Sequence, residues 1–131
     1  MFRDPRESER RKALGRDGEA VAERFLVGCG FRIMARGWRP TGWKRGEIDL
    51  IAERGGEIVF VEVKTRLGGI YGRPEEAVDW RKQRQLCFLA WSWMGENRMN
   101  ERPYRIDVIA VTWDRGQPVV RHLVNAVEAA W

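Results

Sequence analysis

The chain has 131 residues, of which 44% are hydrophobic and 33% are charged. This length predicts one domain, residues 1–131, whose core is large enough to fold without disulfides or a structural metal. The composition excludes a disordered protein. Its apolar runs are shorter than the roughly 18 residues of a membrane helix and its N-terminus is polar, so we expect no membrane span, no secretory signal and a cytoplasmic location.

Rare residue types exclude several kinds of chemistry. Two cysteines, Cys29 and Cys87, are too few for a disulfide scaffold or a four-cysteine zinc site. The single histidine, His122, excludes a metal site built from several histidines. The two serines, Ser8 and Ser92, lie outside any nucleophile-elbow pattern, which argues against a serine hydrolase.

The charge balance is basic, with a net charge of +5 and 24 lysines and arginines. Most of these are arginines, whose guanidinium fork binds phosphate in bidentate fashion. Arginine richness can also reflect genome composition and an ordinary solvated surface. The charge therefore supports nucleic acid as a partner without establishing it.

Hydrophobic periodicity and glycine positions predict two helices and five strands. The predicted elements, in chain order, are a helix over 7–27, strands over 31–36, 47–53 and 57–66, a glycine-rich connector over 66–74, a helix over 75–95, and strands over 104–113 and 118–124. The order αβββαββ predicts an α/β fold in which a mixed central sheet is flanked by helices.

The hairpin between the second and third strands gives the most specific signal. Gly-Gly at 55–56 favours a two-residue turn, because both positions of that turn require positive φ. The turn fixes the register and sets Asp49 directly opposite Glu62. Since side chains alternate between faces, one face is apolar and the other carries charge. The apolar set is Ile48, Leu50, Ala52, Val59, Val61 and Val63, and the other set is Glu47, Asp49, Ile51, Phe60, Glu62 and Lys64.

Two carboxylates directly across a strand pair repel each other. They become favourable when a divalent cation lies between them, and Mg²⁺ takes one or two carboxylates while keeping several waters. Lys64 lies on the same face, about 6.6 Å from Glu62 along the strand, where it could stabilise charge on a phosphate or position a water. The alternative is an amphipathic hairpin facing solvent, with Glu62 bridged to Lys44 or Lys64.

Both helices carry polar residues near their apolar stripes. Lys82 falls within the stripe of the second helix and Gln83 lies near its edge, so Lys82 should either extend to solvent or meet an acidic partner. On the first helix, Glu19 sits at the border of the apolar stripe beside Gly18. The acidic face of the hairpin is a candidate partner for Lys82, and Glu19 could reach the same site or be an ordinary boundary residue.

At the level of motifs, GEIDLI (46–51) and FVEVKTR (60–66) resemble the hallmark segments of the YraN-like proteins. These proteins are similar to archaeal Holliday-junction resolvases and to the PD-(D/E)xK, restriction-endonuclease-like superfamily. The resemblance covers nearly the whole chain, from LGRDGEAVAERFL (14–26) through GRPEEAVDWRKQRQL (72–86) to YRIDVIAV (104–111) and HLVNAV (122–127).

The resemblance implies a restriction-endonuclease-like fold and a metal-dependent nuclease site. Asp49 and Glu62 would bind Mg²⁺, or Mn²⁺ in its place, together with the main-chain carbonyl of Val63. Lys64 would position the attacking water. Glu19 would be an accessory acid, and Lys82, with Gln83 as a second candidate, would match the extra polar residue that such folds carry on the helix after the lysine.

Basic and aromatic residues between the first two strands are candidates for contact with nucleic acid. The loop predicted over 36–46 combines tryptophans that could stack on bases with arginines and a lysine that could bind phosphates. The candidate contacts are Arg36, Trp38, Arg39, Trp43, Lys44, Arg45 and, after the third strand, Arg66.

Two hypotheses of different classes follow. The first is a cytoplasmic Mg²⁺-dependent endonuclease that hydrolyses phosphodiester bonds in DNA, with branched or structured DNA as a candidate substrate. The second is a non-catalytic nucleic-acid-binding module of the same fold.

A second apolar stripe lies on the later helix and is formed by Trp80, Cys87 and Trp91. This stripe is either buried in the core or used to form a homodimer.

Overall fold

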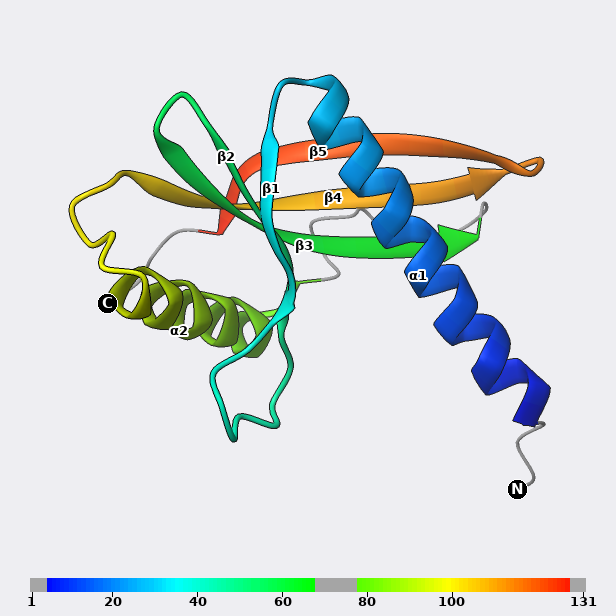
Figure 1. Cartoon of the computed structure of the whole chain (residues 1–131). Helices are drawn as coiled ribbons and strands as arrows, with labels where there is room; N and C mark the ends of the chain where they lie inside the picture. Colours follow the sequence, from blue (N-terminus) through cyan, green and yellow to red (C-terminus); the bar gives the residue numbers. More distant parts are fainter. Residues whose placement is uncertain (1–4, 68–77, 128–131) are drawn as a thin grey trace.

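The computed structural model describes residues 5–67 and 78–127 (Figure 1). Its two helices and five strands occur in the predicted order αβββαββ, so the α/β fold with a mixed sheet is confirmed. The elements are α1 (Pro5–Gly28), β1 (Arg32–Trp38), β2 (Ile48–Arg54), β3 (Glu57–Leu67), α2 (Trp80–Glu96), β4 (Tyr104–Asp114) and β5 (Gln117–Val127).

The five strands form one sheet in sequential order, β1-β2-β3-β4-β5. β3 and β4 run parallel, while the other neighbours are antiparallel. A parallel pair requires a crossover connection, and α2 lies in that connection. The β2–β3 turn has the predicted positive φ at Gly55 (61°) and Gly56 (83°). Pairs from Arg54–Glu57 to Leu50–Val61 confirm the predicted register.

The sheet is covered by one helix on each face, and each helix buries its own core. Along β3, Val59 and Val61 pack in the cluster that includes α1, whereas Ile58 and Phe60 pack in the cluster that includes α2. In a strand, successive side chains point to opposite faces, so the two clusters lie on opposite sides of the sheet. The predicted core stripe of α2 is buried: Val78, Leu86, Leu89, Ala90 and Trp93.

The start of β2 departs from the predicted alternation. Ile48 was expected beside Leu50, but it packs in the α2-side cluster. The paired ladder between β2 and β3 ends at Leu50–Val61. Beyond that pair, the main chain of β2 is no longer held in regular register with β3, so Ile48 can turn toward α2. This is also the place where Asp49 leaves the ladder.

Most predicted boundaries shift by one or two residues, and the shifts of β1, β5 and α2 change the description most. β1 extends to Trp38, so the loop before β2 covers 39–47 instead of 36–46. β5 extends to Val127. α2 begins at Trp80, not at 75, because the Asp79 side chain caps it by accepting a hydrogen bond of 2.9 Å from the main-chain N–H of Lys82. Residues 68–77, which include most of the predicted connector, lie outside the described residues.

The outer stripe of α2 is only partly buried. Trp80 and Trp91 are 61% and 59% exposed, whereas Cys87 is 6% exposed. Burial of this whole stripe in the core was one of the two predictions, and it is wrong for the two tryptophans. The homodimer stays a prediction. Neither helix, over the part of the chain described, has the length and apolar character needed to cross a membrane.

Candidate active site

Asp49 lies where the β2–β3 ladder ends, and its side chain, not a main-chain carbonyl, accepts the hydrogen bond from β3. Its Oδ2 accepts a hydrogen bond of 2.8 Å from the main-chain N–H of Val63. The carboxylate is therefore held against β3, next to Glu62. The predicted juxtaposition of Asp49 and Glu62 is reached through this side-chain contact, because the regular pairs stop at Leu50–Val61.

Glu62 is a buried acid, and one of its carboxylate oxygens lies close to the ammonium groups of two lysines. The residue is 4% exposed. Its Oε1 lies 3.6 Å from Nζ of Lys64 on β3 and 3.5 Å from Nζ of Lys82 on α2. Lys82 thus meets the acidic face of the hairpin, the candidate partner that its inward position indicated. The side-chain amide of Gln83 donates to the main-chain carbonyl of Val78 at 3.0 Å.

The second oxygen of Glu62, Oε2, is buried and has no hydrogen-bond partner among the described residues. A buried acceptor without a partner is costly, and such groups in native proteins need an explanation. Asp107 provides the contrast in the same sheet. Both of its oxygens are satisfied, by Arg105, His122 and the main-chain N–H of Asn125. Asp107 therefore looks structural, whereas Glu62 keeps an acceptor available for a ligand.

Close packing between α1 and β3 brings Glu19 to the site. Gly18 is buried against Thr65, and a Cβ added at Gly18 would lie 1.9 Å from Thr65 Oγ1. Only glycine permits this approach of the helix to the strand. Glu19, the next residue, is half-buried. Burial raises the pKa of Glu19, and the negative charges of Glu47 and Glu62 raise it further.

The acidic surroundings have their largest effect on Asp49, whose pKa is raised to about 7. Burial is the main cause, followed by the negative charge of Glu62. The hydrogen bond from Val63 opposes the shift, as does the positive charge of Lys82. A carboxylate with its pKa near neutrality, among other acids in a partly buried site, is a frequent feature of functional sites. The proton that Asp49 retains can be replaced by a cation.

These residues meet the requirements of a divalent-cation site in their donor chemistry. Mg²⁺ and Mn²⁺ prefer carboxylate and carbonyl oxygens. The expected ligands are Asp49, Glu62 and the Val63 carbonyl, and the unpaired Glu62 Oε2 is the acceptor that a cation would satisfy. Across the described residues, no three Asp, Glu, His or Cys side chains form a ready-made cluster for a metal. The expected set needs two carboxylates and one main-chain oxygen, so it fits this arrangement.

The structure also shows two polar neighbours that were not among the predicted site residues. Glu47, two residues before Asp49, contributes to the acidic charge around Glu19. Gln85 on α2 faces the loop, where a Cβ added at Gly46 would lie 2.8 Å from its Oε1. Glu47 could have been predicted as a site residue, because it shares the face of Asp49 in the hairpin. Gln85 could not, because its position depends on how α2 packs.

The predicted nucleic-acid contacts fall into separate places. Arg39, Lys44 and Arg45 are exposed in the loop over 39–47, the segment that leads directly into Asp49. Trp38 and Trp43 are half-buried and pack against the α2-side core, with the Trp43 ring centroid 4.9 Å from that of Phe88. Both tryptophans therefore have a structural role whether or not they stack on bases.

Two further predicted contacts lie elsewhere. Arg36 is on β1, where its Nε pairs with the Glu23 carboxylate of α1. This ion pair joins β1 to α1 and engages the guanidinium within the protein. Arg66 is half-buried near the end of β3, two residues beyond Lys64, and is near the acidic site by its position in the strand.

Comparison with known proteins places the chain in a family. The profile of the uncharacterised protein family UPF0102 matches residues 18–111, which include Glu19, Asp49, Glu62, Lys64 and Lys82. The chain belongs to this family. UPF0102 is the YraN family, so the resemblance drawn from the hairpin motifs is confirmed.

Relatives in the family match over almost their whole length. A UPF0102 protein of Geobacter metallireducens is 42% identical over 120 residues, which cover 92% of this chain and 96% of the relative. One from Rhodococcus opacus is 44% identical over 115 residues, covering 87% and 95%. One from Clavibacter michiganensis is 45% identical over 118 residues, covering 89% and 98%.

Proposed function

We propose that this UPF0102 protein is a divalent-metal-dependent endonuclease that hydrolyses phosphodiester bonds in DNA. The observation that carries the proposal is the buried Glu62, which has an unpaired Oε2 and lies beside an Asp49 whose pKa is raised to about 7. Such a pair is unfavourable for folding alone and favourable for holding Mg²⁺ or Mn²⁺. The resemblance of the hairpin motifs to PD-(D/E)xK nucleases supports the same chemistry.

Each residue of the site has a role in this proposal. Asp49, Glu62 and the Val63 carbonyl would hold the cation. When bound, the cation supplies Lewis-acid stabilisation of the negative charge that develops on the phosphate. Lys64, whose Nζ lies 3.6 Å from Glu62 Oε1, would donate hydrogen bonds to the attacking water or to a phosphate oxygen.

The remaining two residues would tune the site. Lys82 lies 3.5 Å from the same Glu62 oxygen and balances the negative charge in the absence of a cation. Glu19 would be an accessory acid, and its raised pKa favours the protonated form that can donate a proton. Branched or structured DNA is the substrate class suggested by the resemblance to junction resolvases.

The alternative is a nucleic-acid-binding module that retains the fold without catalysis. The exposed Arg39, Lys44 and Arg45 next to the acidic site favour nucleic-acid binding under either hypothesis. The two hypotheses differ in what they require of Asp49 and Glu62. An enzyme needs both carboxylates, whereas a binding module should bind phosphates better when either negative charge is removed.

A cleavage assay separates the hypotheses. Labelled single-stranded, duplex, flap and four-way DNA would be incubated with the protein and Mg²⁺, Mn²⁺ or EDTA. We expect metal-dependent cleavage of at least one substrate, lost in Asp49→Asn and Glu62→Gln. Glu53→Gln is the control, because it removes the same charge from a β2 residue that pairs with Arg32 and Arg102. Tighter DNA binding by the two site variants, with no cleavage by the wild type, would favour the binding module.

A further inference from the structure

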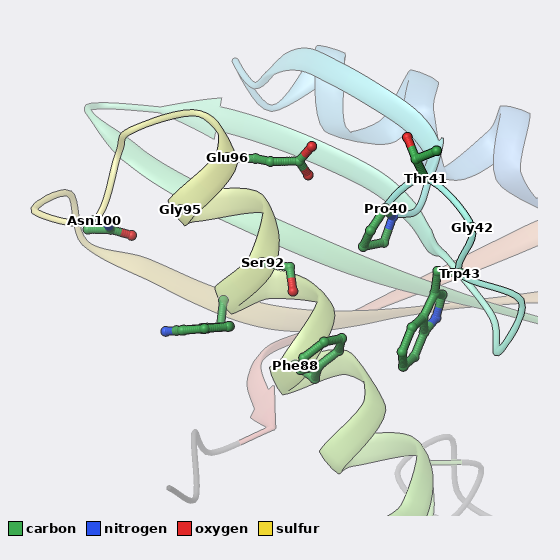
Figure 2. A pocket seen from close by; sticks show the side chains of 10 residues that line it. Pro40, Thr41, Gly42, Trp43, Phe88, Ser92, Gly95, Glu96 and Asn100 are labelled. Atoms are coloured by element: carbon green, nitrogen blue, oxygen red, sulfur yellow. The ribbon is translucent and has the colours of Figure 1, made fainter.

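A groove lies between the loop over 39–47 and the C-terminal half of α2. Its volume is about 590 Å³, within the range of small-ligand pockets. Figure 2 shows the two walls: Pro40, Thr41 and Trp43 on the loop side, and Phe88, Ser92 and Glu96 on the helix side. The groove is separate from the acidic residues of the candidate active site, none of which lines it.

Three aromatic side chains of the groove pack on one another at a tilt. The rings of Trp43 and Phe88 are 4.9 Å apart with an angle of 32° between their planes. Phe88 and Trp91 are 6.3 Å apart at 35°. Trp91 also lines the groove and is 59% exposed. Because Trp43 and Phe88 stack on each other, the exposed ring of Trp91 is the surface on which a planar ligand can stack.

The far wall carries a hydrogen-bond acceptor. Ser92 and Glu96 follow Phe88 at intervals of four residues, so all three lie along one side of α2. In Figure 2 the Glu96 carboxylate reaches across toward Pro40 and Thr41. Glu96 has no ion pair or hydrogen bond with any other residue of the described chain. An ionised glutamate only accepts hydrogen bonds, so it selects a ligand edge that donates.

The charge around the groove favours a ligand attached to phosphates. Arg39, Lys44 and Arg45 are exposed on the loop that forms one wall. A free cation such as a methylated ammonium would match the aromatic rings and Glu96, but it would be repelled by this basic loop. A nucleobase satisfies every feature, because it combines a flat ring, a polar edge and a phosphate backbone.

We propose that this groove binds one unpaired nucleobase of a single-stranded segment, with guanine preferred. Guanine presents two adjacent donors on its Watson–Crick edge, the N1 imino and N2 amino groups, which match the two oxygens of the Glu96 carboxylate. Base stacking on aromatic side chains is available only to an unstacked base, so the ligand is single-stranded or branched DNA and not an intact duplex. This inference rests on the proposed function, because it assumes a nucleic-acid substrate.

The position of the groove also predicts where the base lies relative to the acidic site. α2 connects the two, since Lys82 contacts Glu62 and Phe88 stacks on Trp43. From Lys82 to Phe88 and Ser92 the helix rises about 9 and 15 Å, at about 1.5 Å per residue. The bound base should therefore lie about 9–15 Å along α2 from the contact between Lys82 and Glu62.

Binding of short labelled oligonucleotides in EDTA tests the groove without requiring cleavage. The probes are an all-thymine decamer and the same decamer with one central guanine or inosine, which lacks the N2 amino group. We expect the guanine probe to bind at least 5-fold more tightly than the all-thymine probe, with inosine between them. Equal affinity for all three probes would overturn the proposal.

Two exposed positions give variants that should fold. Trp91→Ala should weaken binding of the guanine probe about 10-fold, while Trp80→Ala, a matched tryptophan of equal exposure outside the groove, should change it less than 2-fold. Glu96→Gln should abolish the preference for guanine while leaving affinity for the all-thymine probe within 2-fold. Equal effects of the two tryptophan variants, or an unchanged preference in Glu96→Gln, would contradict a base-binding groove.

Two rival occupants are decided by the same samples. If tetramethylammonium displaces the guanine probe at concentrations where sodium chloride of equal ionic strength does not, the groove binds cations and the proposal is wrong. If sedimentation shows a dimer that Trp91→Ala dissociates, the groove is an interface between copies and the proposal is also wrong.

The outcomes also separate this inference from the nuclease proposal. If the wild type binds guanine through Trp91 and Glu96 but cleaves no substrate, this inference holds and only the nuclease proposal is wrong. If Trp91→Ala and Glu96→Gln leave cleavage unchanged and all probes bind with equal affinity, only this inference is wrong.

Discussion

Asp49 accepts a hydrogen bond of 2.8 Å from the main-chain N–H of Val63, the residue that follows the buried Glu62. This contact ends the β2–β3 ladder and holds two carboxylates beside each other. Here an acidic side chain replaces a main-chain hydrogen-bond partner, and this replacement sets the geometry of the site.

Asp49→Asn should keep the stability of the metal-free protein or raise it slightly. Asparagine retains an oxygen to accept from Val63 and removes the repulsion from Glu62. Added Mg²⁺ or Mn²⁺ should raise the melting temperature of the wild type, because a cation that binds only the folded state stabilises it, and the variant should lose this shift. Thermal denaturation with and without metal measures both effects. A melting-temperature increase of equal size in wild type and variant would place the cation elsewhere.

The raised pKa of Asp49 predicts a pH dependence of stability. Its folded pKa of about 7 lies above its ordinary value of 3.8, so the folded state binds the proton more tightly than the unfolded state. The stabilisation is fully present below pH 4 and is lost as pH rises through 7. From the size of the shift it is on the order of 2–4 kcal/mol. Denaturant titrations of metal-free protein between pH 5 and 8 should show this loss, and Asp49→Asn should show a smaller one.

The same pKa predicts that metal binding competes with a proton. Below pH 7, the affinity for Mn²⁺ should rise with pH, by about tenfold per unit in the limit, because the cation must displace the proton from Asp49. Above pH 7 the affinity should level off. Calorimetric titration in buffers of different ionisation enthalpy would report the released proton. A pH-independent affinity with no proton release would show that Asp49 is not a ligand.

Lys64 and Lys82 approach the same Glu62 oxygen, but they should behave differently. Lys64→Ala should abolish cleavage and leave metal affinity within a few-fold, because lysine is not a ligand. Lys82→Ala removes a positive charge that lowers the pKa of Asp49, so this pKa and the pH at which metal affinity levels off should both rise. Parallel cleavage and metal titrations of the two variants separate these roles. Lys12→Ala, an exposed lysine on α1, is the control.

Gly18 should be sensitive to a single added methyl group. A Cβ there would lie 1.9 Å from Thr65 Oγ1, so Gly18→Ala should destabilise the fold by about 1–3 kcal/mol and displace Glu19. Gly15→Ala is a matched control in the same helix, with nothing within 4 Å of the added Cβ, and should stabilise by about 0.5–1 kcal/mol. Chemical denaturation measures both, and Thr65→Ala should partly rescue Gly18→Ala. Equal stabilities of the two alanine variants would contradict the close packing.

Salt dependence tests whether the loop over 39–47 contacts phosphates. Replacing Arg39, Lys44 and Arg45 together by glutamine should reduce the slope of log affinity for DNA against log salt by about three, at about 0.9 per contact. The control replaces Lys12, Arg24 and Arg98, which are exposed and change the net charge by the same amount. If both triple variants reduce the slope equally, the effect is general charge and the loop makes no specific contacts.

The sequence determined the element order, the hairpin register and the residues of the acidic site. Those features depend on local rules: Gly-Gly at 55–56 fixes the turn, alternation sorts the faces, and periodicity places Lys82 on the inner side of α2. The start of α2 was within the reach of the same rules, since Asp79 is a typical capping residue.

Only the tertiary structure decided which partners these residues meet. The unpaired oxygen of Glu62, the approach of α1 through Gly18 and the switch of Ile48 to the other core all depend on contacts between elements distant in the chain. The pairing of Arg36 with Glu23 and the stacking of Trp43 on Phe88 are of the same kind. A periodic pattern gives the direction of a side chain within its own element. Its neighbour depends on how strands splay and helices cross, which is fixed by packing of the whole core.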